Sequence, residues 1–197
     1  MTSHDGRSAW PYQRLVTAAL VFLAATALST LTLLAVRWVA GPPANTAAGG
    51  DGLGFVRIDK PARPLSLPSL RGHETIDLAK LAGKPIVMNF WSSMCPPCKE
   101  ETPAITRVAR ALGGKVNFLG VDSADLQYRA IDFVTKYKVP YQIAVDASGS
   151  TTDSYGVLDL PVTLFLSPSG KTVLGENFGA LTSHELRVIL RRLYHVS

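Results

Sequence analysis

A buried-strand pattern in this chain runs directly into its only two cysteines. Residues 86–91 (Ile-Val-Met-Asn-Phe-Trp) are almost all apolar, and Cys95 and Cys98 follow just before a helical pattern begins. A strand covered on both faces has such a continuous apolar run, whereas a half-exposed strand alternates apolar and polar residues. The sequence therefore predicts a covered central strand, with the cysteines between the end of this strand and the start of a helix.

Further strand-like and helix-like patterns alternate after this strand. The last helical pattern opens with a capping box, Thr182 to Glu185, in which each residue can bond the other's backbone N–H. We expect an α/β fold with a central mixed sheet flanked by helices and a small hairpin extension before it. The expected strands are 65–70, 75–78, 86–91, 116–121, 141–145, 162–166 and 171–174, and the expected helices are 97–112, 126–137 and 182–193.

The cysteine pair predicts thiol chemistry. If the helix begins near Pro97, Cys95 lies at its N-terminus, where unpaired N–H groups and the helix dipole stabilise a thiolate. Cys98, about one turn further, can close a disulfide with Cys95 and serve as the resolving thiol. A static disulfide is the first alternative, although a loop this short constrains the unfolded chain little. Zinc binding is the second, but no further cysteine pair or spaced histidines supply four ligands.

The N-terminal part of the chain predicts a membrane anchor. Residues 15–36 carry no charge, and about 20 apolar helical residues span a hydrocarbon core. We assign a tail to 1–14, a transmembrane helix to 15–38, a flexible Gly-rich linker to 39–57 and the folded domain to 58–197. A cleavable signal peptide is the alternative, and a buried core helix is a weaker one.

Basic residues around the span suggest its orientation. Arg7, Arg14 and the terminal amine precede it, which places the N-terminus in the cytoplasm and the domain outside the cell membrane. The net charge of +5 is scattered, with no basic stripe and no interleaved aromatics. Nucleic-acid binding therefore has little support.

Two segments resemble a known family. Residues 89–103, Asn-Phe-Trp-x-x-x-Cys-x-Pro-Cys-x-x-Glu-x-Pro, are similar to the active-site segment of membrane-anchored thioredoxin-like proteins of the TlpA/ResA type. Residues 155–166, with Leu160-Pro161 at their centre, resemble the cis-proline segment of that family. The resemblance extends from near Pro64 to the end of the chain.

This resemblance implies a thioredoxin fold that reduces disulfides in secreted or membrane-tethered clients, such as apocytochrome c or copper-site cysteines. Cys95 would attack and Cys98 would resolve the mixed disulfide. Pro161 would be a cis-proline facing the cysteines, the alternative being an ordinary trans proline that opens a strand. Glu101 would hold or relay a proton, the alternative being a solvated glutamate on the helix surface.

The residues around the cysteines would bind the client. Met94, Pro96, Leu160 and Trp91 are the candidates, with plain core packing as the alternative for Trp91. Met94 stands where the family often has tryptophan, and Pro96 also departs from the common pattern.

Other functions remain open from the sequence. A thioether beside two thiols also suits Cu(I), so a copper-handling protein using Met94, Cys95 and Cys98 is one alternative. A disulfide-forming oxidase is another. A peroxidase is less favoured because no Pro-x-x-x-Thr-x-x-Cys pattern surrounds either cysteine. We expect a monomer with no cofactor beyond its redox-active disulfide and no bound metal. With no nucleotide motif in the chain, a membrane thiol carrier would supply its electrons.

Overall fold

The structure is a computed structural model that describes residues 15–16, 18–20, 23, 26 and 54–196. The chain divides into two units, residues 1–48 and 49–197. In the first unit the described residues are helical, while the tail 1–14 and most of the predicted span 15–38 lie outside the described residues. Among those described, no helix combines the length and apolar character that crossing a membrane requires.

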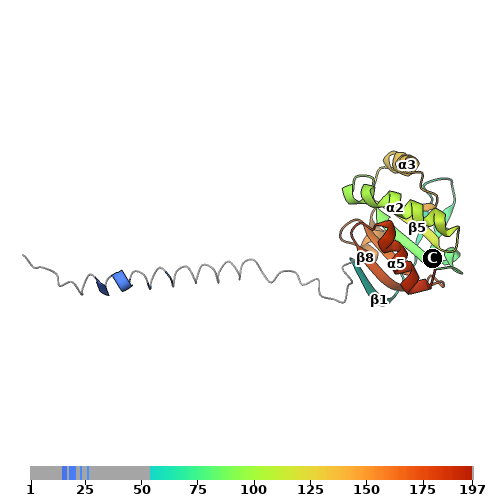
Figure 1. Cartoon of the computed structure of the whole chain (residues 1–197). Coiled ribbons are helices and arrows are strands. Elements are labelled where there is room, and N and C mark those ends of the chain that lie inside the picture. Colours follow the sequence, from blue (N-terminus) through green and yellow to red (C-terminus); the bar gives the residue numbers. More distant parts are fainter. Residues whose placement is uncertain (1–14, 17, 21–22, 24–25, 27–53, 197) are drawn as a thin grey trace, which may run out of the picture. The chain divides into compact units, whose positions relative to one another are not determined.

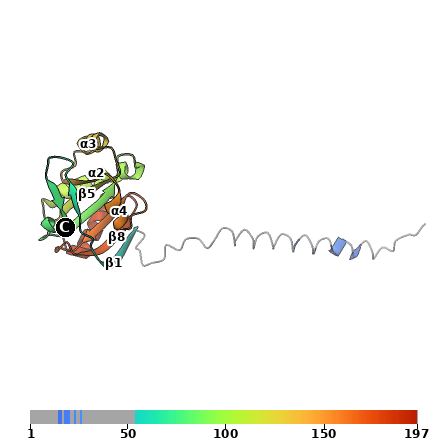
Figure 2. The same cartoon turned by 180° about the vertical axis from the view of Figure 1, so that it is seen from behind.

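A six-stranded mixed sheet forms the centre of the second unit, in the order β1-β8-β7-β4-β5-β6 (Figures 1 and 2). β4 runs parallel to β5 and antiparallel to β7, and β5 runs parallel to β6. β7–β8 and β8–β1 complete the sheet as antiparallel pairs. The strands are β1 (Phe55–Pro61), β4 (Ile86–Trp91), β5 (Asn117–Ser123), β6 (Gln142–Asp146), β7 (Val162–Leu166) and β8 (Thr172–Phe178).

Both faces of the sheet are covered. On one face α2 (Pro96–Leu112) and α5 (Ser183–Tyr194) pack together over β4, with α3 (Gln127–Lys136) beside them (Figure 1). The other face carries a two-stranded hairpin and two short helices. These are β2 (Ser66–Pro68), β3 (Thr75–Asp77), the 3₁₀ helix η1 (Leu78–Leu81) and α4 (Ser150–Ser154).

Burial on both sides explains the apolar run of β4. All six of its side chains are buried. Ile86, Met88 and Phe90 pack with the hairpin side, whereas Val87 and Trp91 pack under the helices. The prediction of a covered central strand is confirmed, and so is the mixed sheet flanked by helices. The predicted hairpin and the capping box of α5 are also present.

The structure extends the sheet beyond the sequence assignment. β1 begins at Phe55, inside the stretch 39–57 that we assigned to a linker, and pairs with β8. β8 itself continues to Phe178, four residues beyond the predicted end at 174. The sequence did not predict β1 because it is an edge strand whose partner, β8, is distant in sequence. The domain therefore begins by Phe55, and residues 39–53 of the predicted linker lie outside the described residues.

Candidate active site

Cys95 caps the N-terminus of α2. Pro96 and Pro97 occupy the first positions of the helix, where a missing N–H costs no hydrogen bond. The first free amide of this turn is that of Cys98, and it donates to Cys95 Sγ at 3.2 Å. The sulfur thus takes the place that an oxygen of serine or aspartate usually fills at a helix cap. The sequence prediction for Cys95 is confirmed in this respect.

The two cysteines are bonded, and they differ in exposure. Their sulfur atoms are 2.07 Å apart. Cys98 is fully buried against Trp91 and Phe133, while Cys95 is partly exposed. When the bond is reduced, the amide of Cys98 and the dipole of α2 stabilise negative charge on Cys95. Only Cys95 is therefore placed to attack a disulfide on another molecule.

The loop before β7 lies against the exposed sulfur. The Leu160–Pro161 peptide bond is cis, as the resemblance implies. The carbonyl oxygen of Leu160 lies 3.5 Å from Cys95 Sγ. Leu160 is partly exposed and Pro161 is buried, and the neighbouring Leu158 is 96% exposed. This loop and the start of α2 together form the rim around the disulfide.

Glu101 is buried one turn beyond Cys98, and so is not a solvated surface residue. Its side chain is 1% exposed. Asn89 Nδ2 donates to Oε1 at 2.8 Å, and the backbone N–H of Leu181 donates to Oε2 at 3.1 Å. Burial raises the pKa of Glu101 from 4.5 to about 7, and these two hydrogen bonds oppose that rise. The group can exchange a proton near neutral pH.

A groove brings solvent close to this carboxyl group. It has a volume of about 630 Å³ and lies between α2 and the segment that leads into α5. The lining residues are Glu100, Glu101, Pro103, Ala104 and Arg107 from α2, and residues 180–184. The groove thus borders Glu101, and its lining includes none of the residues around the disulfide.

The other predicted site residues take different positions. Met94 is 60% exposed and Pro96 is also exposed, so both lie on the rim. Trp91 is only 3% exposed and stacks on Phe133, with ring centroids 4.5 Å apart. Trp91 thus packs with Cys98 and Phe133 in the core, as the core-packing alternative predicted, while client contact by its ring stays a prediction. Leu158 is an exposed apolar residue that the sequence analysis did not single out, although it lies two residues before Leu160 of the cis peptide bond.

A guanidinium group lies against the thioether that would assist copper binding. Arg129 Nη1 is 3.1 Å from Met94 Sδ. This positive charge disfavours Cu(I) at that sulfur. Within the described part of the chain, no three His, Cys, Asp or Glu side chains gather as a metal site would require.

A second buried carboxyl group escaped the sequence analysis. Asp122, near the end of β5, has 0% exposure and pairs in register with Trp91 of β4. Burial and the nearby charges of Asp125 and Asp146 raise its pKa from 3.8 to about 7. Neither of its oxygens has a hydrogen-bond partner among the described residues. A single aspartate in a strand pattern gave no signal of this environment.

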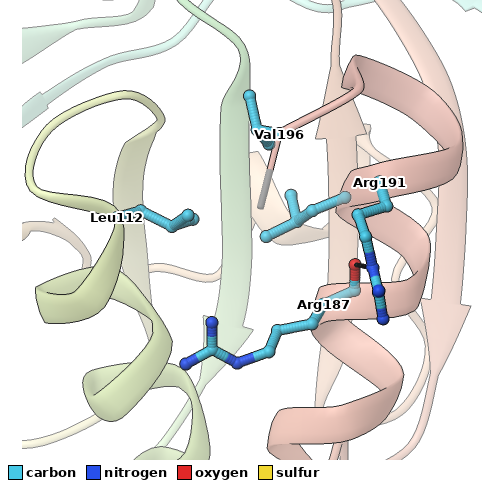
Figure 3. A pocket seen from close by; sticks show the side chains of 5 residues that line it. Leu112, Arg187, Arg191 and Val196 are labelled. Carbon is cyan, nitrogen blue, oxygen red and sulfur yellow. Dashed lines mark hydrogen bonds between the residues drawn. The ribbon is translucent and has the colours of Figure 1, made fainter.

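A small pocket at the far end of α2 is separate from this chemistry. It holds about 170 Å³ and is lined by Leu112, Arg187, Leu190, Arg191 and Val196 (Figure 3). Leu112 is the last residue of α2, and at 1.5 Å per residue the helix places it roughly 24 Å from the cysteines. This pocket therefore lies away from the disulfide.

Comparison with known proteins agrees with this geometry. The AhpC/TSA family matches residues 58–173. The thiol–disulfide oxidoreductase ResA of Halalkalibacterium halodurans is 31% identical over 120 residues, which cover 60% of this chain and 68% of that protein. ResA of Bacillus thuringiensis subsp. konkukian is 28% identical over 139 residues, covering 70% of this chain and 79% of that protein.

A solved structure is similar in the same region. It is a secreted disulfide oxidoreductase of Mycobacterium tuberculosis, described as homologous to DsbE of E. coli. The two chains share 29% identity and superpose with a TM-score of 0.59, over 66% of this chain and 96% of the other. These relatives thus carry names of the disulfide oxidoreductase class.

Proposed function

The chain belongs to the AhpC/TSA family, and we propose that it is an extracytoplasmic thiol–disulfide oxidoreductase that reduces disulfides in secreted or membrane-tethered client proteins. The observation that carries this proposal is the capping of α2 by Cys95 Sγ, with Cys98 fully buried behind it. That arrangement favours one thiolate at the surface and one resolving thiol within. The names of the ResA relatives describe thiol–disulfide oxidoreductases.

The reaction follows from the two positions. The Cys95 thiolate attacks one sulfur of a client disulfide, and the other client sulfur leaves as a thiolate. Cys98 then loses its proton and attacks Cys95 Sγ, which releases the second client thiolate. Two electrons pass to the client, and the Cys95–Cys98 bond seen here is the product. Glu101, one turn beyond Cys98, accepts the Cys98 proton directly or through a water molecule and releases it to the groove.

The rim around Cys95 would select the client. Met94 and Pro96 flank Cys95 in the chain and are exposed, and the backbone of Leu160 lies beside Cys95 Sγ, so the groups near the exposed sulfur are largely apolar. An extended client segment would lie along the Leu160 backbone, which is beside Cys95. Family resemblance favours apocytochrome c or copper-site cysteines as clients.

The cellular setting completes the proposal. The predicted anchor at 15–38 would hold the domain outside the cell membrane, as a monomer. A membrane thiol carrier would return electrons to the disulfide, because the sequence contains no nucleotide motif for a reductant of its own. In an oxidising compartment a reducing dithiol requires such a supply.

Trapping the mixed disulfide tests the exchange reaction. Cys98→Ser should accumulate a covalent complex with an oxidised peptide that contains Cys-x-x-Cys-His, the haem-attachment pattern. Cys95→Ser is the matched control and should form none. A peptide in which alanine replaces the histidine measures client preference. A complex that forms equally through Cys98 in the Cys95→Ser protein would contradict the assigned roles.

The reduction potential tests the direction. A value near that of thioredoxin, about −270 mV, is expected for a reductant. A value near that of DsbA, about −120 mV, would instead identify a disulfide-forming oxidase. Anaerobic titration with Cu(I) separates the remaining alternative, since tight stoichiometric binding without reductase activity would overturn the proposal.

A further inference from the structure

The short loop between β8 and α5 is held at both ends. At its start, Asn177 Nδ2 donates to the carbonyl of Gly179 at 2.9 Å, and the N–H of Gly179 donates to the carbonyl of Pro161 at 3.0 Å. Gly179 has a φ of 84°, a conformation that favours glycine. At its end, Thr182 and Glu185 form the capping box of α5. Between these two fixed points lie Ala180 and Leu181.

The loop presents one donor to the buried carboxyl group. The N–H of Leu181 donates to Glu101 Oε2 at 3.1 Å. This bond favours the charged form of Glu101 and so opposes the rise in its pKa that burial causes. Any displacement of the Leu181 amide therefore makes the carboxyl group harder to ionise.

Asn177 itself is unusual in its burial. It is 2% exposed, and it pairs in register with Phe55 of β1 and Thr163 of β7. Its amide nitrogen bonds Gly179, but its Oδ1 has no partner among the residues that the structure describes. A buried polar atom without a partner costs free energy. The stabilising contribution of this side chain is its hydrogen bond to the carbonyl of Gly179.

We propose that Asn177 is a positioning residue for Glu101, acting through the Gly179–Leu181 loop. By holding the Gly179 carbonyl it keeps the Leu181 amide on the carboxyl group, and so determines how readily Glu101 gives up its proton during disulfide exchange. Asn177 contacts neither sulfur. This inference rests on the proposed function of Glu101 in the redox reaction.

Other ionisable groups near Glu101 must stay unchanged in the test. Tyr141, which precedes β6, is partly buried and lies within electrostatic range of the carboxyl group. Glu100, Arg107 and His184 share the groove. Substitution of Asn177 alters the charge of none of them, so a change in the titration of Glu101 would report on the loop.

The experiment compares two asparagines that make the same kind of bond. Asn117, at the start of β5, donates from Nδ2 to the carbonyl of Leu81 at 2.7 Å. Asn117 is three residues away along β5 from Gly120. Gly120 is the residue paired with Asn89, which donates a hydrogen bond to Glu101. Asn117→Leu is therefore a matched control for Asn177→Leu, because it removes a similar bond away from Glu101.

Two readouts are needed. The first is the titration of the Glu101 side chain by NMR in the oxidised protein, with Glu101→Gln to identify the signal. The second is the pH midpoint of client reduction. Asn177→Leu should move both midpoints upward by up to about one pH unit, the size expected for one hydrogen bond to a charged group. Asn117→Leu should leave both where the wild type has them.

Each outcome decides the proposal. Equal midpoints in Asn177→Leu and the wild type would overturn it, as would equal upward shifts in both variants. If Asn177→Leu fails to fold, the Leu181 amide resonance of the wild type provides the test, since its chemical shift should follow the Glu101 titration. An amide that does not respond would overturn the proposal. Because the NMR titration needs no activity, a wild type that reduces no disulfide defeats the proposed function alone.

Discussion

Glu101 and Asp122 are two buried carboxyl groups in opposite situations. Each is about 1% exposed or less, and burial raises each pKa to about 7. Glu101 receives hydrogen bonds from Asn89 and Leu181 and borders a groove. Asp122 has no such donor among the described residues, and the negative charges of Asp125 and Asp146 lie close to it.

The difference separates a proton-exchange site from a neutral buried acid. Two donors aimed at Glu101 stabilise its ionised form, so it can alternate between its two states at little structural cost. The ionised form of Asp122 is opposed both by burial and by like charges, so it stays protonated while the fold is intact below about pH 7. A similar pKa thus arises from different balances of burial, charge and hydrogen bonding, and of the two groups only Glu101 has donors to its ionised form among the described residues.

The largest expected effect is on catalysis. Glu101→Gln should slow client reduction at pH 7 by about 10²-fold or more, the usual contribution of a positioned acid–base group. Asp122→Asn should change the rate by less than about threefold. In the wild type the resolution step should speed up as the pH rises through about 7, because the base form of Glu101 is required. Stopped-flow measurement of client reduction across pH tests all three statements.

Equal losses of activity in Glu101→Gln and Asp122→Asn would contradict the inferred difference between the two carboxyl groups. The matched substitutions replace each acid by its own amide, so they leave side-chain size nearly unchanged. A circular dichroism melt of each variant should accompany the rates, since a fold change could mimic a catalytic loss. If Glu101→Gln kept the wild-type pH profile, Glu101 would not be the proton acceptor.

The second expected effect is on stability, and it falls on Asp122. Its pKa rises from 3.8 to about 7 on folding, so the folded state binds the proton more tightly than the unfolded state. The free energy of unfolding must then fall as the pH rises from about 4 to 7. Asp122→Asn cannot ionise, so it should be more stable than the wild type at pH 8 by about 1–3 kcal/mol.

Urea unfolding at several pH values provides the measurement. The advantage of Asp122→Asn should shrink as the pH falls and disappear below about pH 3, where the wild-type carboxyl group is protonated in both states. Some pH dependence should persist in the variant, because the pKa of Glu101 is also raised on folding. A variant that is less stable than the wild type at pH 8 would mean that Asp122 has a partner in its ionised form.

A smaller effect is expected at Asn89. Its amide group bonds Glu101 Oε1 at 2.8 Å and Thr163 Oγ1 at 3.0 Å. Asn89→Leu should lower the free energy of unfolding by about 1 kcal/mol and raise the pKa of Glu101, because a donor to the charged form is lost. The pH midpoint of client reduction reports the second change. A lower midpoint would contradict the assigned donor role.

The sequence predicted most of the helices and strands, because their apolar periodicity and capping patterns involve residues close together along the chain. The bounds 86–91 for the central strand match β4, and the capping box marked the start of α5. β1 was missed because its pairing with β8 joins segments more than a hundred residues apart. Such an edge strand shows only a short pattern beside a Gly-rich stretch.

The site was predictable to the extent that it lies in one segment. Cys95, Cys98 and Glu101 share α2, so helical spacing already placed them together. The resemblance to a known family, rather than any local pattern, supplied Pro161. The contacts of Glu101 with Asn89 and Leu181, and the isolation of Asp122, depend on packing between elements. No spacing in the sequence encodes those contacts.

The smallest expected effect concerns Ser93, between Trp91 and the cysteines. Its backbone N–H donates to Asp125 Oδ2 at 2.6 Å, and alanine would keep that bond. Its hydroxyl is buried, with no hydrogen-bond partner in the described part of the chain. Ser93→Ala removes this unpaired group and should stabilise the fold by about 0.5 kcal/mol at pH 7. If Ser93→Ala instead lowered the stability and raised the pKa of Asp122, the hydroxyl would be a hydrogen-bond donor to that carboxyl group through water. Asp122 would then resemble Glu101 in having a donor to its ionised form.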